Sequence, residues 1–347
     1  MRAMILSRIA PVTDAGAPLD AAEIPAPEPG AGEVLLRVTA CGVCHTELDE
    51  IEGRTPPPFL PVVPGHQVVG TVERLGPDVT GIAPGTRVGV AWIFSACGTC
   101  AHCRAGNENL CPAFRATGRD AHGGYAEYMV APAAFVHPIP SAFTDVQAAP
   151  LLCAGAVGYR SLRLCNLRNG EPLGLVGFGA SAHLVLQMAR HEFPDTPIFV
   201  FAREETERAF ARELGAAWAG PIGAPPPAAT AACIDTTPVW TPVLAALETL
   251  ASGGRLVINA IRKESQDRQV LADLDYPKHL WMEKEIKSVA NVTRRDVREF
   301  LTRAESIPLA PEVEEYPLAE AGRALRDLKR RKIRGAKVLR IATERKP

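Results

Sequence analysis

The stretch EPLGLVGFGASAHLVLQMARH, Glu171–His191, decides the fold of this 347-residue chain. Residues 172–176 form an apolar run of the kind that makes a buried strand, and residues 180–191 continue with the apolar spacing of a helix. Between them, Gly177–Ala182 reads GFGASA and fits the pattern G-x-G-x-x-G/A. A glycine-rich turn that joins a buried strand to a helix predicts the start of a βαβ unit.

Gly177, Gly179 and Ala182 occupy the three small positions of this pattern. In a dinucleotide-binding turn, the first glycine makes the tight turn and the second lets a pyrophosphate approach the backbone. The helix N-terminus then faces the negative charge of the pyrophosphate. Such turns also occur for packing reasons alone, but the strand–turn–helix context favours a dinucleotide-binding site.

The end of the next strand bears on which dinucleotide binds. NAD sites usually place an acidic residue there for the ribose 2′-hydroxyl, whereas this chain has Ala202 followed by Arg203. A missing carboxylate and an adjacent guanidinium suit a 2′-phosphate, so we expect NADP(H) to be favoured over NAD(H). The alternative is that Arg203 points to solvent and that Glu204 or Glu205 binds the ribose.

Strands alternate with helices on both sides of this turn. Further strands are expected at residues 197–202, 231–237 and 255–260, and helices at residues 203–216 and 242–254. This alternation predicts an α/β fold with a doubly wound parallel sheet of Rossmann type. The residues before 151 are rich in Pro and Gly with short alternating segments, which predicts short strands joined by turns, in an all-β or a mixed region.

The composition is that of an ordinary soluble globular protein, with 47% hydrophobic and 22% charged residues. A net charge of −1 gives no indication of a nucleic-acid or anionic-membrane partner. The most apolar stretch, residues 172–189, is too short to span a membrane, and the N-terminus lacks the apolar core of a signal peptide. We therefore expect a cytoplasmic protein, in which clustered cysteines more often bind metal than form disulfides.

Four of the nine cysteines lie within 15 residues, in C-x2-C-x2-C-x7-C spacing. Gly98 and Gly106 allow this loop to curl. The spacing predicts a closed tetrahedral zinc site of structural type, since the common iron–sulfur spacings differ from it. The expected ligands are Cys97, Cys100, Cys103 and Cys111.

A second group of potential ligands is scattered along the chain. Cys41 and Cys44 stand in a C-x-x-C frame, His66 lies in PGHQVVG, and Cys153 lies in PLLCAG. A catalytic zinc needs three protein ligands and one open position. From these residues alone the C-x-x-C pair remains open to three interpretations: a redox dithiol, metal ligands, or two packed cysteines.

The chain resembles the zinc-dependent alcohol dehydrogenases of the medium-chain dehydrogenase/reductase family over nearly its whole length. The resemblance is carried, in the family's order, by CGVCHTEL (41–48), PGHQVVGTVERLG (64–76), the four-cysteine loop, GGYAEY (123–128), PLLCAGAVGY (150–159) and GFGASA. It implies a GroES-like β-rich catalytic domain over residues 1–150, to which residues 290–347 return. It also implies a Rossmann cofactor-binding domain over residues 151–289, with the active site in the cleft between the two.

In this family the cysteine directly before the H/R-T/S pair is the ligand. The resemblance therefore implies a catalytic zinc on Cys44, His66 and Cys153, and a packed, non-ligating Cys41. Together with the four-cysteine loop, this gives two zinc ions per chain. The redox interpretation is then disfavoured, because a dithiol needs both cysteines and a thioredoxin-like context.

The resemblance assigns further roles next to these ligands. Thr46 takes the alcohol proton and passes it towards the cofactor ribose, and His45 meets the pyrophosphate; the alternatives are a helix-cap hydroxyl and an exposed surface imidazole. Asp49 stands where a complete relay often has a histidine, and its reference pKa near 4 is poorly matched to shuttling at neutral pH. Glu47 replaces the usual aspartate that orients the ligand histidine. Gln67 replaces a common glutamate, which predicts a lower pKa for a bound alcohol.

Three apolar residues, Phe59, Trp92 and Phe94, are candidates for lining the substrate pocket, with ordinary core packing as the alternative. As pocket residues they would suit primary aliphatic or aromatic alcohols. The expected function is reversible hydride transfer between such an alcohol or its aldehyde and NAD(P). The alternatives are a polyol or sugar dehydrogenase of the same family and a non-catalytic zinc- or nucleotide-binding relative. By resemblance we also expect a homo-oligomer, either a dimer or a tetramer.

Overall fold

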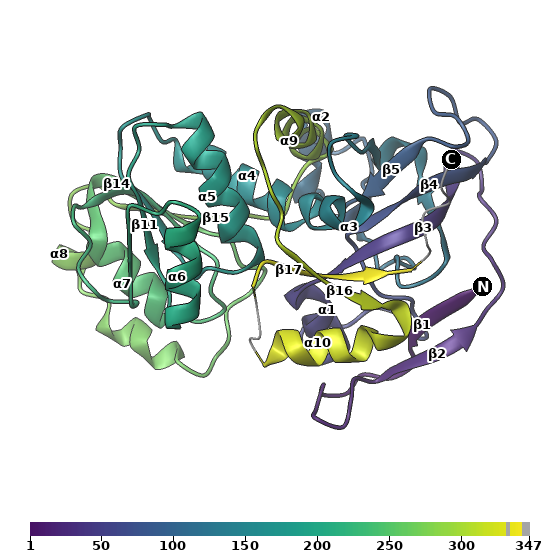
Figure 1. Cartoon of the computed structure of the whole chain (residues 1–347), viewed down its shortest axis with the longest axis horizontal. Helices are drawn as coiled ribbons and strands as arrows, with labels where there is room; N and C mark the ends of the chain where they lie inside the picture. Colours follow the sequence, from purple (N-terminus) through teal and green to yellow (C-terminus); the bar gives the residue numbers. More distant parts are fainter. Residues whose placement is uncertain (331–333, 342–347) are drawn as a thin grey trace. The chain divides into compact units, whose positions relative to one another are not determined.

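A computed structural model describes residues 1–330 and 334–341 of the chain (Figure 1). The chain divides into two compact units. The first comprises Met1–Cys153, Val292–Glu305 and Ala310–Pro347, and the second comprises Ala154–Asn291 and Ser306–Leu309. The first unit is therefore built from segments on both sides of the second. The expected return of residues 290–347 is described as far as Ile341, apart from residues 331–333, which with residues 342–347 lie outside the description.

The first unit is rich in β-structure. In its described residues the main sheet has seven strands, in the order β16-β17-β3-β4-β5-β9 with β8 also paired to β3. Their bounds are Val313–Pro317 (β16), Ala336–Arg340 (β17), Glu33–Val43 (β3), Val68–Leu75 (β4), Arg87–Val90 (β5), Val136–Pro138 (β9) and Tyr128–Pro132 (β8). Only the β16–β17 pair is parallel among these.

Shorter elements complete this unit. The remaining strands are β1 (Arg2–Leu6), which pairs with β2 (Leu19–Glu23), and β6 (Ile93–Ser95), which pairs with β7 (Arg115–Ala116). The α-helices are α1 (His45–Ile51), α2 (Ala101–Arg104), α3 (Asp145–Ala148), α9 (Arg294–Ser306, whose last residue falls in the second unit) and α10 (Ala321–Lys329). The 3₁₀ helices are η1 (Glu108–Leu110), η2 (Ala133–Phe135), η3 (Ala149–Leu152) and η5 (Leu318–Glu320).

Strand β3 is the centre of this unit. It is buried along most of its length because β4, β8 and β17 pair with it and helices cover it. Val34, Leu36 and Val38 of β3, each 0% exposed, belong to the same apolar core as Leu48 of α1 and Leu325 of α10. Helix α1 follows β3 after one residue, so the core that fixes β3 also fixes the start of α1.

The second unit contains a parallel sheet with strand order β12-β11-β10-β13-β14-β15. The strands are β10 (Leu173–Val176), β11 (Ile198–Phe201), β12 (Trp218–Gly220), β13 (Thr230–Asp235), β14 (Leu250–Ile258) and β15 (Glu285–Ser288). Its helices are α4 (Ala154–Cys165), α5 (Ala180–Glu192), α6 (Glu205–Glu213), α7 (Thr241–Thr249), η4 (Arg268–Asp273) and α8 (Tyr276–His279). The order reverses beside β10, which makes the sheet doubly wound and confirms the predicted fold class.

One helix is shorter in the structure than the sequence predicts. Residues 242–254 were predicted to be helical, but α7 ends at Thr249 and β14 begins at Leu250. Leu250 pairs with Thr230 of β13, and Gly253 has a left-handed φ of +72°, which a continuing helix does not allow. Pairing with a neighbouring strand therefore outweighs the local helical preference of this segment.

No helix within residues 1–330 and 334–341 is both long enough and apolar enough to cross a membrane.

Candidate active site

Three potential metal ligands from separate segments meet in the first unit. Cys44 precedes α1, His66 precedes β4, and Cys153 directly follows η3. The Sγ atoms of the two cysteines and a ring nitrogen of His66 all lie within 4.8 Å of one another. Two sulfurs and one imidazole nitrogen, held this close, suit a zinc site that keeps a fourth position open.

Cys44 is placed by its role as the N-cap of α1. Its backbone is extended, with φ −138° and ψ −177°, and its Sγ accepts the backbone N–H of Thr46 at 3.3 Å. Glu47 completes a capping box, since its Oε2 accepts the backbone N–H of Cys44 at 2.8 Å. The helix start therefore fixes the direction of the Cys44 sulfur.

Glu47 also holds the histidine. Its Oε1 contacts Nδ1 of His66, and both side chains are fully buried. The other ring nitrogen of His66, Nε2, lies 3.6 Å from Cys44 Sγ. A carboxylate on one ring nitrogen fixes the orientation of a ligand histidine, so Nε2 is the atom available to a metal.

Gly65 brings His66 into this position. Its φ of +99° is in the left-handed region, and a Cβ there would lie 2.4 Å from Cδ1 of Tyr125 and 2.8 Å from Sγ of Cys41. Cys41 itself is 0% exposed within β3. Among the described residues, the group of potential ligands around His66 does not include Cys41.

The surroundings of Cys44 and His66 shift the pKa values of both side chains. The pKa of the Cys44 thiol lies well above its ordinary value, because it shares a hydrogen bond with Cys153, is buried, and lies near the negative Glu47. Burial lowers the pKa of His66, but the charges of Glu47 and Cys44 outweigh burial and raise the pKa well above its ordinary value. A bound divalent cation would reverse the rise in the pKa of the Cys44 thiol, since a coordinating thiol is deprotonated outright.

The other residues expected around Cys44 lie on or near α1. Thr46 is buried in the first turn, and His45 is the exposed first residue. Asp49, 5% exposed, is ion-paired with Arg54. Gln67 is 3% exposed, and its side chain lies so close to Gly42 of β3 that a Cβ there would be 2.7 Å from Gln67 Cδ.

The four-cysteine loop forms the second potential metal site. The sulfurs of Cys97, Cys100, Cys103 and Cys111 all lie within 4.8 Å of one another. The backbone N–H of Cys100 donates to Cys97 Sγ, and that of Cys103 donates to Cys100 Sγ, both at 3.4 Å. Hydrogen bonds from the backbone N–H groups of Thr99 and Cys100 to Cys97 Sγ lower the pKa of Cys97 to about 6. Four convergent sulfurs form the donor set of a closed structural zinc site.

The loop is attached to helix α9. Glu108, 4% exposed, accepts from the backbone N–H of Arg294 at 2.9 Å and from its Nε at 3.0 Å. The Arg294 guanidinium lies 4.6 Å from the ring centroid of Phe135. Residues far apart in the sequence therefore hold the loop in place.

The glycine-rich turn stands between β10 and α5 in the second unit. Gly177 has a φ of +82°, and Gly179 is the N-cap of α5. A Cβ built on Gly179 meets nothing within 4 Å, which leaves the backbone open to a ligand, whereas Ala182 is buried at 1% exposure. The turn therefore lies at the carboxyl end of β10, where doubly wound sheets bind dinucleotides.

Three charged side chains, those of Arg203, Glu204 and Arg208, lie at the end of β11. Ala202 is fully buried, and Arg203 is 59% exposed with its Nε 2.7 Å from Oε1 of Glu204. Arg208 of α6, which we did not predict, donates to the carbonyl oxygens of Ala202 at 2.7 Å and Arg203 at 2.6 Å. Its i,i+3 spacing from Glu205 was the available sequence signal, and it indicates only a helix surface pair.

The three candidate pocket residues differ in their surroundings. Trp92 is 7% exposed in an apolar cluster, with its ring 5.0 Å from that of Phe114. Phe94 is 6% exposed and belongs to the main core of the first unit. Phe59 is 39% exposed and packs edge-on against His122. The structure thus gathers Trp92 and Phe94 into packed regions and leaves Phe59 at the surface.

The comparisons with known proteins agree with this organisation. The alcohol dehydrogenase GroES-like domain matches residues 30–141. A second profile, of mitochondrial ribosomal protein L37, matches residues 246–341, which cover well under half of the chain and take in parts of both units. The "Probable alcohol dehydrogenase AdhA" of Mycobacterium tuberculosis is 44% identical over 329 residues, 93% of each chain.

Two solved structures are similar over nearly the whole chain. An NAD-dependent alcohol dehydrogenase superposes with a TM-score of 0.87 at 25% identity, covering 99% of this chain and 100% of its own. A thermostable alcohol dehydrogenase from Pyrobaculum aerophilum, with cobalt and zinc bound, gives 0.85 at 25% identity, covering 98% of this chain and 99% of its own. Sheet topology and superposition together define a medium-chain dehydrogenase/reductase. Within that class, the chain belongs to the zinc-type alcohol dehydrogenases, which confirms the resemblance in the sequence. It is thus an oxidoreductase acting on small molecules.

Proposed function

We propose that this alcohol dehydrogenase binds two zinc ions per chain and reduces aldehydes to primary alcohols with NADPH, by a reversible reaction. The observation that carries the catalytic assignment is the convergence of Cys44, His66 and Cys153, with Glu47 fixing the histidine ring. Two thiolates and a neutral imidazole would balance the charge of Zn²⁺. Cys97, Cys100, Cys103 and Cys111 are the proposed ligands of the structural ion.

A zinc ion bound by Cys44, His66 and Cys153 would act as a Lewis acid on the substrate oxygen. The chain's own residues supply orientation and proton transfer. Thr46, next to Cys44 in α1, is proposed to exchange a proton with the substrate hydroxyl, and His45 to meet the cofactor pyrophosphate. Asp49 is ion-paired with Arg54, so a relay beyond Thr46 through Asp49 has to compete with that pair.

The proposed preference for NADP(H) rests on the end of β11. Ala202 offers no carboxylate there, and Arg203 is exposed and able to turn towards a 2′-phosphate. Arg208 supports this proposal indirectly, because its bonds to two carbonyls fix the backbone that carries Arg203. Glu204 favours NAD(H) instead, because it pairs with Arg203 and has oxygens that could accept from a ribose hydroxyl. One similar structure is described as NAD-dependent.

The proposed domains are residues 1–150 with 290–347, which would hold the structural zinc and two ligands of the catalytic zinc, and residues 151–289, which would hold the cofactor and supply the third ligand, Cys153. Aliphatic or aromatic primary alcohols remain the proposed substrates. The apolar character of Trp92, Phe94 and Phe59 supports this class over polyols. The burial of Trp92 and Phe94 in packed clusters favours a supporting role for those two.

Initial rates of benzaldehyde and butanal reduction, with NADPH and NADH in parallel and the zinc content measured, test the proposal. We expect two zinc ions per chain and faster turnover with NADPH. Arg203→Ala should raise the KM for NADPH far more than that for NADH, and an equal rise would overturn the cofactor assignment.

Cys44→Ser should lose one zinc and all activity, whereas Cys41→Ser is the matched control and should keep both. Protein that holds two zinc ions but turns over neither aldehyde with either cofactor would favour a non-catalytic role or a different substrate class.

A further inference from the structure

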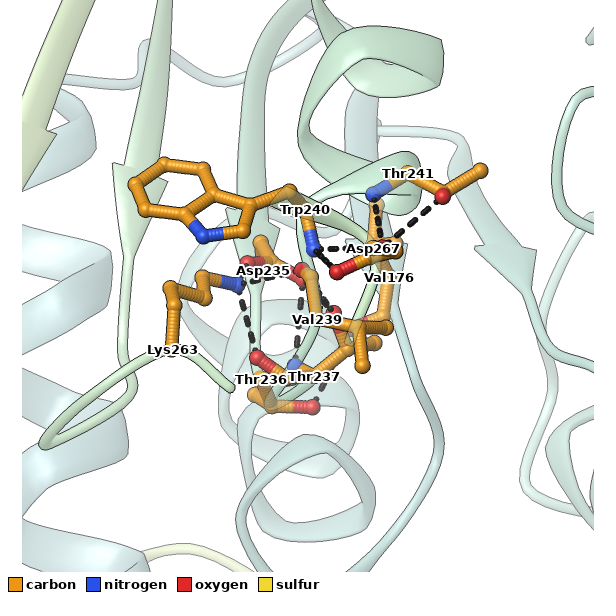
Figure 2. Close-up of polar contacts among 9 residues, drawn as sticks. All are labelled: Val176, Asp235, Thr236, Thr237, Val239, Trp240, Thr241, Lys263 and Asp267. Carbon is orange, nitrogen blue, oxygen red and sulfur yellow. Dashed lines mark hydrogen bonds and ion pairs between the residues drawn. The ribbon is translucent and has the colours of Figure 1, made fainter. Parts of the chain in front are cut away.

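A buried lysine–aspartate pair lies at the carboxyl end of β13, in the second unit (Figure 2). Asp235, the last residue of β13, has a side chain 0% exposed, and Lys263, after β14, has a side chain 7% exposed. Lys263 Nζ contacts Asp235 Oδ2 and donates to the carbonyl oxygens of Thr237 at 2.7 Å and Val239 at 3.1 Å. The three ammonium protons therefore match three acceptors.

These contacts close the loop of residues 236–240. Oδ1 of Asp235 accepts from the backbone N–H of Thr237 at 3.1 Å and from its hydroxyl at 2.7 Å. At the far end of the loop, the carboxylate of Asp267 accepts from the backbone N–H groups of Trp240 and Thr241 at 2.9 and 2.7 Å. The loop is thus held at both ends by carboxylates, and by Lys263 in its middle.

The same loop packs against the glycine-rich turn. Thr236 donates to the carbonyl oxygen of Val176, the last residue of β10, from its backbone N–H at 2.9 Å and its hydroxyl at 3.0 Å. A Cβ on Gly177 would lie 2.8 Å from Thr236 Oγ1 and 3.1 Å from Thr237 Cγ2. Because β10 and β13 are neighbours, the loop borders the site proposed for the dinucleotide.

Stability alone is a weak reason for such a pair. Taking both charges out of water costs much of what their attraction returns, and an apolar pair of similar volume is often as stable. By contrast, a lysine that donates to three fixed acceptors holds the loop in one defined position. We propose that Asp235 and Lys263 are positioning residues of the cofactor site, which hold the Thr236–Trp240 loop against the Gly177 turn so that the turn is preformed for a dinucleotide. This inference rests on the proposed use of a nicotinamide dinucleotide.

The test is the dissociation constant of NADH and of NADPH, titrated by fluorescence on the full, zinc-loaded chain. Lys263→Met keeps the length of the side chain and removes its donors. It should raise both constants by about tenfold or more, since small displacements in a preformed site have effects of this size. The two factors should be equal, because the pair is at the pyrophosphate turn rather than at the 2′ position. Zinc content should not change.

Lys284→Met is the matched control. Lys284 Nζ donates to the carbonyl oxygens of Leu247 in α7 at 2.7 Å and of Lys278 in α8 at 2.9 Å. Neither bond involves the Gly177 turn. Its dissociation constants should match those of the wild type. If Lys263→Met does not fold, Thr236→Val decides instead: it removes the hydroxyl bond to Val176 and should weaken both dinucleotides by a smaller factor.

Folded Lys263→Met with wild-type dissociation constants would overturn the inference, even if its melting temperature falls, because the pair would then be structural only. Unchanged constants in Thr236→Val would do the same where Lys263→Met is insoluble. A wild-type protein that binds neither dinucleotide would instead overturn the proposed function, so the two failures are distinct.

Discussion

Glu47 serves two structures at once. One of its oxygens caps α1 at the Cys44 backbone, and the other contacts His66. Two of the three proposed ligands of the catalytic zinc, Cys44 and His66, therefore depend on one buried carboxylate. A carboxylate that bonds to the free ring nitrogen of a ligand histidine fixes the ring orientation and raises the basicity of the ligand.

Glu47→Gln should therefore reduce zinc affinity at the Cys44 site by about 10- to 100-fold, the range usual for such partners. Chelator competition with the zinc released per chain measures this. Glu52→Gln is the control, because Glu52 ends the same helix but bonds to Val12 and Lys329, away from the ligands. Equal zinc retention in the two variants would contradict the role given to Glu47.

His137 makes stability depend on pH. It is 3% exposed in β9, and burial, with Arg298 and Arg294 nearby, lowers its pKa from 6.5 to about 4. Between pH 4 and pH 6.5, His137 therefore binds more protons in the unfolded chain than in the folded chain. The stabilisation is complete above pH 6.5 and is lost as the pH falls towards 4.

From pH 7 to pH 5 the free energy of unfolding should fall by about 2 kcal/mol because of this residue. His137→Phe should remove that part of the fall, which denaturant unfolding at the two pH values measures. If the variant loses as much stability as the wild type over this range, other groups cause the loss.

At the scale of elements, the four-cysteine loop and α9 stabilise each other through Glu108 and Arg294. Glu108→Ala leaves the Arg294 guanidinium without this carboxylate, and since Arg294 is 38% exposed, water replaces part of the interaction. We expect a loss of about 2 kcal/mol and faster release of the structural zinc to a chelator.

Thermal melting and zinc-release kinetics measure these two effects. Glu171→Ala, which breaks the surface ion pair with Arg168, is the matched control and should change neither. A variant of Glu108 that melts and releases zinc like the wild type would show that the loop is held by its metal alone.

Elements with a strong local pattern could be predicted, and those that depend on partners could not. The β10–turn–α5 unit was predicted because apolar periodicity and Gly177 act over a few residues. The end of α7 was not, because it depends on the pairing of Leu250 with Thr230. The four-cysteine metal site could likewise be predicted, because the spacing of its cysteines is a local pattern. The contact between Asp235 and Lys263 could not, because the two residues are 28 positions apart and no local pattern links them.

At the scale of the whole molecule, one sheet edge is exposed. All four residues of β15, the last strand of the parallel sheet, are exposed. Ile286 is 46% exposed, and Trp281 and Met282 beside this strand are 55% and 52% exposed. An open, partly apolar edge strand is a template for pairing with another chain, so we expect the predicted homo-oligomer to use it.

Ile286→Lys should therefore shift the protein to a smaller species in size-exclusion chromatography with light scattering. Ile9→Lys, at an exposed apolar residue of the first unit, is the control and should leave the assembly unchanged. An unchanged mass for Ile286→Lys would exclude this edge as the interface.

The split of the first unit has a consequence for biosynthesis. Strand β17 pairs with β3 so that Leu339 lies opposite Cys41, three residues before the proposed ligand Cys44. A ribosome synthesises residues 154–291 completely before the last strand of the first unit emerges. Residues 154–291 can therefore begin to fold during translation before the sheet next to the proposed metal ligands is complete. Zinc insertion at Cys44 is accordingly expected to follow the synthesis of residues 154–291.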